Sequence, residues 1–147
     1  MSQSDLIEKK GEIKKNLEEE IQTVIYLFPK KDHDKMVEFS KPFTEVFRKY
    51  GVSRWGIFQL SSTTNDMEFT TIARTVSANL EDEEVWIEIF HYNDKKHKDE
   101  VMEKMKNDKN CGQGFQQFMK LITPGSSVII GDFSSVNGRV YQIITNI

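Results

Sequence analysis

The chain has 147 residues and a formal net charge of −3, with acidic and basic residues interspersed. This length suits one folded domain that buries roughly two thirds of its unfolded surface, and the charge pattern leaves no nucleic-acid footprint. The single cysteine, Cys111, excludes an intramolecular disulfide and a thiolate metal cluster. We find no apolar run near the ~18 residues of a membrane span and no signal peptide. We therefore expect a cytoplasmic protein with neither membrane nor nucleic-acid partners.

The first 19 residues are mostly polar, with a weak helical stripe formed by Leu6, Ile13 and Leu17 and interrupted by Gly11. We interpret residues 1–19 as a helical arm that is appended to the folded domain and either frays or docks on it. A sharper alternative is an arm that packs on a partner subunit.

Residues 20–28 alternate apolar side chains on both sides, which predicts a first strand, and Pro29 ends it because proline cannot donate to a ladder. Residues 33–50 carry apolar residues at helical spacing. Pro42 should kink this helix or split it. Gly51 is the expected stop, in the left-handed conformation.

Residues 54–60 predict a second strand, followed by the polar loop 61–66. Residues 69–78 alternate as a further strand would, and we expect them to pair antiparallel with residues 85–92. The segment 79–84 between them is an acidic turn.

The stretch 85–92 is the predicted centre of the fold. Its β-branched and aromatic residues place large apolar groups on both faces of a strand. Both faces therefore need a cover. Helices of a chain this short would cover one face, so we expect a second subunit to cover the other.

After this strand, Asn93 or Asp94 should cap a helix over residues 95–109, because either side chain can accept a backbone N–H of the first turn. Residues 112–121 predict a short helix, and 127–133 the last core strand.

The dipeptide Asn137-Gly138 is a hairpin signal that would pair residues 139–147 back as a C-terminal strand. The element order predicts an α+β fold with one antiparallel sheet, the ferredoxin-like split βαβ arrangement. We divide the chain into the arm 1–19, the ferredoxin-like domain 20–136 and the strand extension 137–147.

Several stretches of the chain resemble the DUF1428 family, an uncharacterised family of the dimeric α/β-barrel superfamily. They are residues 28–30, 47–51, 86–95, Met102, Met105, Asp108 and 127–133. The resemblance implies a homodimer in which two ferredoxin-like sheets pack face to face into a barrel. The chain departs from the family at 61–66, where the family has an acidic, proline-containing segment, and at His91, where it has a glutamate.

His91, at the end of the central strand, is our candidate catalytic base; the plainer interpretation is a histidine that caps the strand edge. Arg54 and Arg74 on predicted strands could hold an anionic or polar ligand, or form salt bridges at the sheet rim. Glu88 shares this predicted ligand-binding set.

Trp55 and Trp86 could line an aromatic ligand pocket, or belong to the core and dimer interface. The chain has no His-x-x-x-His pair, phosphate-binding glycine loop or nucleophile elbow. We therefore expect neither a metal nor a cofactor.

Three functions follow from these observations. The first is a homodimer that binds a small molecule in a cavity between sheet and helices, without catalysis. The second, implied by relatives in the superfamily, is a cofactor-free monooxygenase-like enzyme for a small aromatic substrate, with His91 as base. The third is a protein-interaction or scaffold module that uses the N-terminal arm.

Overall fold

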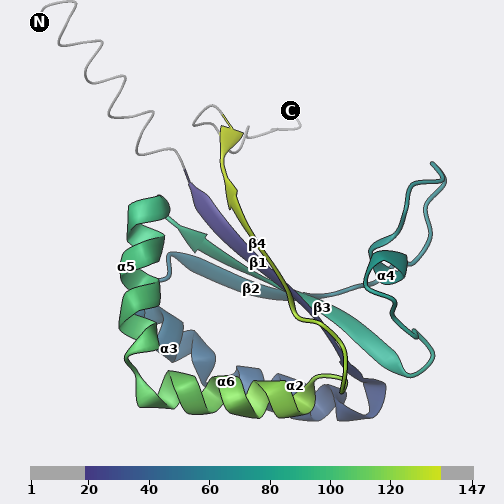
Figure 1. Cartoon of the computed structure of the whole chain (residues 1–147), viewed down its shortest axis with the longest axis horizontal. Coiled ribbons are helices and arrows are strands. Elements are labelled where there is room, and N and C mark those ends of the chain that lie inside the picture. The colour runs from purple at the N-terminus through teal and green to yellow at the C-terminus, as the bar shows by residue number, and fades with distance from the viewer. Residues whose placement is uncertain (1–18, 137–147) are drawn as a thin grey trace, which may run out of the picture.

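The computed structural model describes residues 19–136. Its four strands form one antiparallel sheet in the order β2-β3-β1-β4 (Figure 1). The strands are β1 (Glu20–Pro29), β2 (Arg54–Gln59), β3 (Glu83–Tyr92) and β4 (Ile129–Ser134). The fold is α+β, and this strand order is consistent with the predicted ferredoxin-like arrangement.

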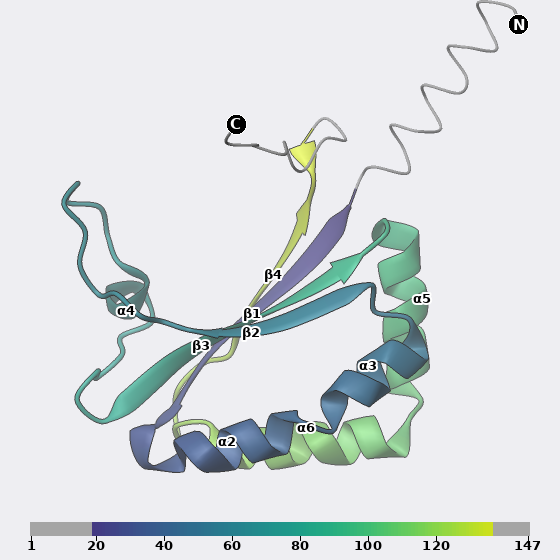
Figure 2. The same cartoon turned by 180° about the vertical axis from the view of Figure 1, so that it is seen from behind.

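The longer helices lie together on one side of the sheet, whereas the short α4 and its flanking loops lie on the other (Figures 1 and 2). The helical segments are η1 (Lys30–Asp32), α2 (His33–Ser40), α3 (Phe43–Tyr50), α4 (Ile72–Thr75), α5 (Lys95–Lys106) and α6 (Lys109–Leu121). No helix of the described residues is long and apolar enough to cross a membrane.

Two separate clusters of buried side chains fill the space between the sheet and the helices. One cluster contains Tyr26, Phe28, Met36, Trp86 and Ile122. The other contains Phe90, Tyr92 and Val101. In the strands these residues occupy even-numbered positions, because alternate side chains of a strand point to the same face. The helices thus bury one set of the alternating apolar residues.

The odd-numbered positions of β1 and β3 form the opposite face, which we call the open face. Strand register adds the even positions of β2 and the odd positions of β4 to it. Its apolar residues are Ile21, Ile25, Leu27, Phe58, Val85, Ile87, Ile89, Ile129 and Phe133. Val85, close to Ile72 of α4, is buried, but Phe58 is 56% exposed and Phe133 is 55% exposed. The apolar pattern on both faces of β3 is confirmed, and within residues 19–136 the helices cover only one of the two faces.

The strand predicted at residues 69–78 is wrong: this segment is a loop that leads into α4. Thr71 starts the helix, since its side chain accepts a hydrogen bond from the backbone N–H of Arg74. Ser77 then takes a left-handed φ of 55°. β3, the predicted partner, already has β1 and β2 as neighbours, so neither edge of β3 is free to pair with this segment.

The break at Pro42 is confirmed, because α2 and α3 are separate helices. Gly51 ends α3 with a φ of 95°, as predicted. Asp94 caps α5 by accepting a hydrogen bond from His97 N–H at 2.7 Å. The predicted hairpin at Asn137-Gly138, the strand 139–147 and residues 1–18 of the predicted arm lie outside the described residues.

The helix predicted over 95–109 ends earlier, at Lys106, and α6 starts at Lys109. Asp108 causes this restart, since its carboxylate accepts hydrogen bonds from the N–H groups of Asn110 and Cys111. Cys111 therefore lies in the first turn of a helix. Burial, and then the negative charge of Asp108, nevertheless raise the pKa of its thiol, which disfavours a reactive thiolate.

An ion-pair network ties α5 to the edge of the sheet. Lys98 is 8% exposed, and its ammonium lies 3.3 Å from an Asp132 carboxylate oxygen and 3.8 Å from one of Glu20. The Ser134 hydroxyl donates a further hydrogen bond to Glu20. These contacts supply partners for charges that would otherwise be costly to bury.

Two glycines of α6 offer a matched test of its packing on α3. A Cβ added at Gly114 would lie 2.6 Å from Cζ of Phe43, whereas one added at Gly112 meets nothing within 4 Å. We expect Gly112→Ala to raise the free energy of unfolding by about 1 kcal/mol through helix propensity. Gly114→Ala should lower it by about 1–3 kcal/mol, because Phe43 must move. Urea denaturation measures both, and equal effects would contradict this packing.

Candidate functional site

Glu88 places a carboxyl group in the middle of the helix-covered face of β3. Its cross-strand neighbours are Val24 on β1 and Ile57 on β2, and all three residues keep intermediate exposure. Val24 packs against both core clusters. The carboxyl group therefore lies where the two clusters meet incompletely and solvent still reaches the sheet.

Two neutral side chains lie beside this carboxyl group. Nε1 of Trp55 donates a hydrogen bond to Oε1 of Glu88 at 2.9 Å, and the nearby Tyr26 hydroxyl also favours the charged form of the carboxyl. Burial raises the pKa of the Glu88 carboxyl, and these two interactions only partly offset this. Burial, and then the nearby Glu88 charge, also raise the pKa of Tyr26, so Tyr26 stays a donor.

Aromatic rings surround the donors. The Phe47 ring packs edge-on against Trp55, with centroids 4.9 Å apart, and against Phe90 at 5.0 Å. Tyr26 makes a similar contact with Phe118 at 4.8 Å. Within residues 19–136 no lysine, arginine or histidine forms an ion pair with Glu88. The site is thus one carboxyl group without a counter-ion, surrounded by aromatic rings.

The structure brings together only part of the predicted site. Trp55 and Glu88 are in direct contact, whereas Trp86 is 5% exposed and packs in a core cluster. Arg54 and His91 are cross-strand partners on the open face, and Nδ1 of His91 forms a hydrogen bond with the Glu19 carboxyl group. Arg74 is exposed on α4.

Tyr26 is the residue that sequence reasoning missed. It shares a face with Glu88 through strand alternation and the β1–β3 register. The signal in the sequence was the run of even-numbered residues of β1, which ends in a tyrosine and a phenylalanine and shares the face of Glu88.

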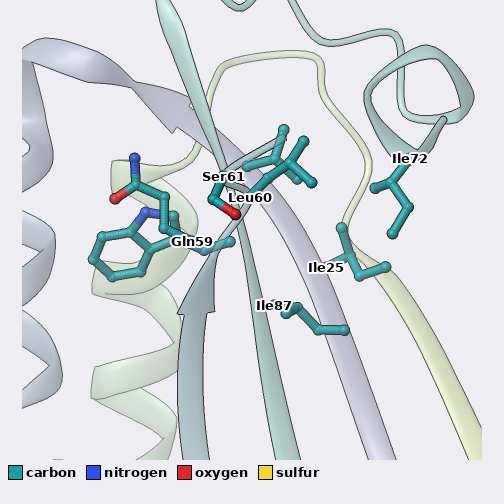
Figure 3. Close-up of a pocket in the computed structure, with 8 residues that line it drawn as sticks. Ile25, Gln59, Leu60, Ser61, Ile72 and Ile87 are labelled. Carbon is teal, nitrogen blue, oxygen red and sulfur yellow. The ribbon is translucent and has the colours of Figure 1, made fainter. Parts of the chain in front are cut away.

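A hollow lies on the open face, where α4 approaches the sheet (Figure 3). It has a volume of about 200 Å³, and its lining is mostly apolar. Ile25 and Ile87 of the sheet contribute to its lining together with Ile72 of α4, and Ser61 adds a hydroxyl. It offers no charged side chain, so its chemistry is that of a contact surface for an apolar group.

No group of three or more histidine, cysteine, aspartate or glutamate residues within 19–136 is arranged to hold a metal ion. The chemistry of the described site is therefore that of Glu88, Trp55 and Tyr26.

These observations define the chain as an α+β protein with a four-stranded antiparallel sheet and a partly exposed acid on its helix-covered face. The family model described as "Protein of unknown function (DUF1428)" matches residues 20–121, and the chain belongs to this family. No curated protein matches the sequence.

Among solved structures, the chain is similar to "Structure of CPII bound to ADP and bicarbonate, from Thiomonas intermedia K12". The identity is 12% and the TM-score 0.32, over 78% of this chain and 87% of that one. A TM-score this low supports no inference about the chain described here.

The raised pKa of Glu88 makes stability depend on pH. A carboxyl with a pKa above its ordinary 4.5 binds its proton more tightly in the folded state. The stabilisation of the folded state by this proton is fully present below pH 4.5 and is lost as the pH rises through the folded-state pKa. We expect wild type to lose about 1.4 kcal/mol per pH unit in that window relative to Glu88→Gln. Urea titrations from pH 4 to 8 test this, with exposed Glu103→Gln as control, and parallel profiles would contradict it.

Proposed function

We propose that the protein is a homodimer that binds a small molecule at Glu88, between the sheet and the helices. The observation that carries this proposal is the partly exposed Glu88 carboxyl, held by Trp55 and Tyr26 where the two core clusters do not close. An apolar residue at this position would join the clusters into one core. A buried acid without a counter-ion costs stability, and such groups gather at functional sites.

The chemistry of the site favours a cationic or neutral ligand over an anion. Among residues 19–136, Glu88 supplies the only charge in the site, and its hydrogen-bonding partner Trp55 is neutral. Aromatic faces attract cations and stack on flat rings. The ligand class that fits is a small aromatic amine, or a neutral aromatic with a hydrogen-bond donor.

The oxygenase-like alternative has less support from this geometry. Its candidate base, His91, lies on the face opposite Glu88 and is engaged by Glu19. Binding at the acid therefore remains the proposal, and Arg54 and Arg74 take no part in it.

The open face supports the proposed homodimer. Between its rims this face presents only apolar side chains, threonine and glycine. A contiguous apolar patch of this kind commonly marks an interaction surface. A twofold contact lets one self-complementary patch cover its copy.

We expect phenylethylamine-like cations to bind the purified protein, and phenylacetate-like anions of the same size to bind at least about tenfold more weakly, a difference of about 1.4 kcal/mol. Glu88→Gln should remove this preference because it removes the charge, whereas Glu103→Gln should keep it. Ligand-observed NMR or calorimetry measures the affinities. Equal affinity for both charges would refute the assignment.

Phe58→Asp should dissociate the proposed dimer, because it places a charge in the apolar open face. Phe58 is 56% exposed, and Phe115, a control on α6, is 62% exposed. Sedimentation velocity should show a rise of at least about tenfold in the dimer dissociation constant for Phe58→Asp, and no change for Phe115→Asp. A Phe58→Asp protein that sediments as wild type would disprove this dimer.

A further inference from the structure

The loop between β2 and α4 reaches away from the rest of the molecule (Figures 1 and 2). Every residue from 61 to 70 is exposed, so this part of the loop is not packed into either core cluster. An exposed segment of this length is expected to be polar. Here it instead carries two of the most exposed large apolar residues of the described chain, Met67 and Phe69, at 72% and 69% exposure.

The end of this loop, residues 65–69, is an ordered turn, which we call the apolar tip. Oδ1 of Asn65 accepts hydrogen bonds from the N–H groups of Met67 and Phe69, both at 3.0 Å. Nδ2 of Asn65 donates to the Phe69 carbonyl oxygen at 2.8 Å. Glu68 takes a left-handed φ of 59°, which is uncommon for a residue with a Cβ. Local hydrogen bonds thus fix the turn that exposes Met67 and Phe69 to solvent. Because the turn is ordered before binding, less conformational entropy is lost when it binds a partner.

We infer that the apolar tip of each copy packs on the open face of a second copy, so that the two subunits clasp each other reciprocally. This inference rests on the proposed homodimer and adds to it the segment that makes the contact. Each copy carries both an apolar tip and an open apolar face. Two copies related by a twofold axis can therefore form the same contact twice.

The area of the sheet supports this occupant. From strand spacing and rise per residue, the four strands offer a planar footprint of roughly 500 Å². A stable interface buries about 800 Å² per partner. The projecting tip adds two well-exposed apolar side chains, Met67 and Phe69, to the apolar surface that the sheet offers.

The charges are complementary as well. The apolar tip carries Asp66 and Glu68, both exposed and without an ion pair in the described residues. On the rim of the open face, the guanidinium of Arg54 likewise makes no ion pair within residues 19–136. An acidic tip that meets Arg54 favours the correct orientation of the two copies.

The test compares full-length Phe69→Asp with full-length Phe115→Asp by sedimentation velocity over a dilution series. Both phenylalanines are well exposed, at 69% and 62%, so both variants should keep the melting temperature of the wild-type monomer. We expect Phe69→Asp to raise the dimer dissociation constant at least about tenfold, and Phe115→Asp to leave it unchanged. Met67→Asp should act as Phe69→Asp does.

A wild-type affinity for the Phe69→Asp dimer would overturn this inference while leaving the proposed homodimer intact. Equal weakening by Phe69→Asp and Phe115→Asp would also overturn it, because the effect would not be specific to the tip. A wild-type protein that is monomeric at all concentrations would remove both the homodimer and the tip contact, and would assign the open face to another occupant.

Discussion

The structure depends on one strand that is apolar on both faces. β3 lies between β1 and β2, so its backbone groups are paired on both sides. Its even-numbered side chains are covered by α2, α3, α5 and α6, whereas Ile87 and Ile89 on the other side remain only partly buried. Hydrophobic burial is the main favourable term in folding. The helices bury one apolar face of the sheet and leave the other partly exposed to water. Burial of this second face would add stability, and this motivates the proposed dimer.

Glu88 departs from the apolar pattern on the covered face. Its carboxyl interrupts what would otherwise be one continuous core, and Trp55 donates a hydrogen bond to it without neutralising it. A structural role would be better served by a cation, as Lys98 shows with Glu20 elsewhere in the same fold. The contrast between a paired buried charge and an unpaired one in the same sheet is the reason to place a ligand at Glu88.

Periodicity predicted much of the fold. The two-sided alternation of 85–92 identified the central strand, and the single residues Pro42 and Gly51 marked the breaks in the first helical region. Residues 69–78 misled the same reasoning, because a stretch with modest apolar content can alternate by chance. Instead, the segment forms a short helix, which Thr71 caps and which the left-handed backbone at Ser77 follows. The alternation of apolar and polar residues does not report on such local and tertiary effects.

The site was predictable only in part, for a related reason. Trp55 and Glu88 stood out as an aromatic and a charge on expected strands, but which strands are neighbours, and in what register, follows from the packing of the whole sheet. Tyr26 was missed for lack of that register. Arg74 was placed on a strand that does not exist, and Arg54 and His91 face away from the acid.

The open face itself can be observed directly by isotope-filtered NOE spectroscopy on a mixture of labelled and unlabelled protein. If a second copy covers this face, methyl groups of Ile87 and Ile89 in one subunit will show contacts to the rings of Phe58, Phe133 or Phe69 in the other. If these methyl groups show no contacts between subunits and respond fully to a paramagnetic cosolvent, the face is wet and the account is wrong.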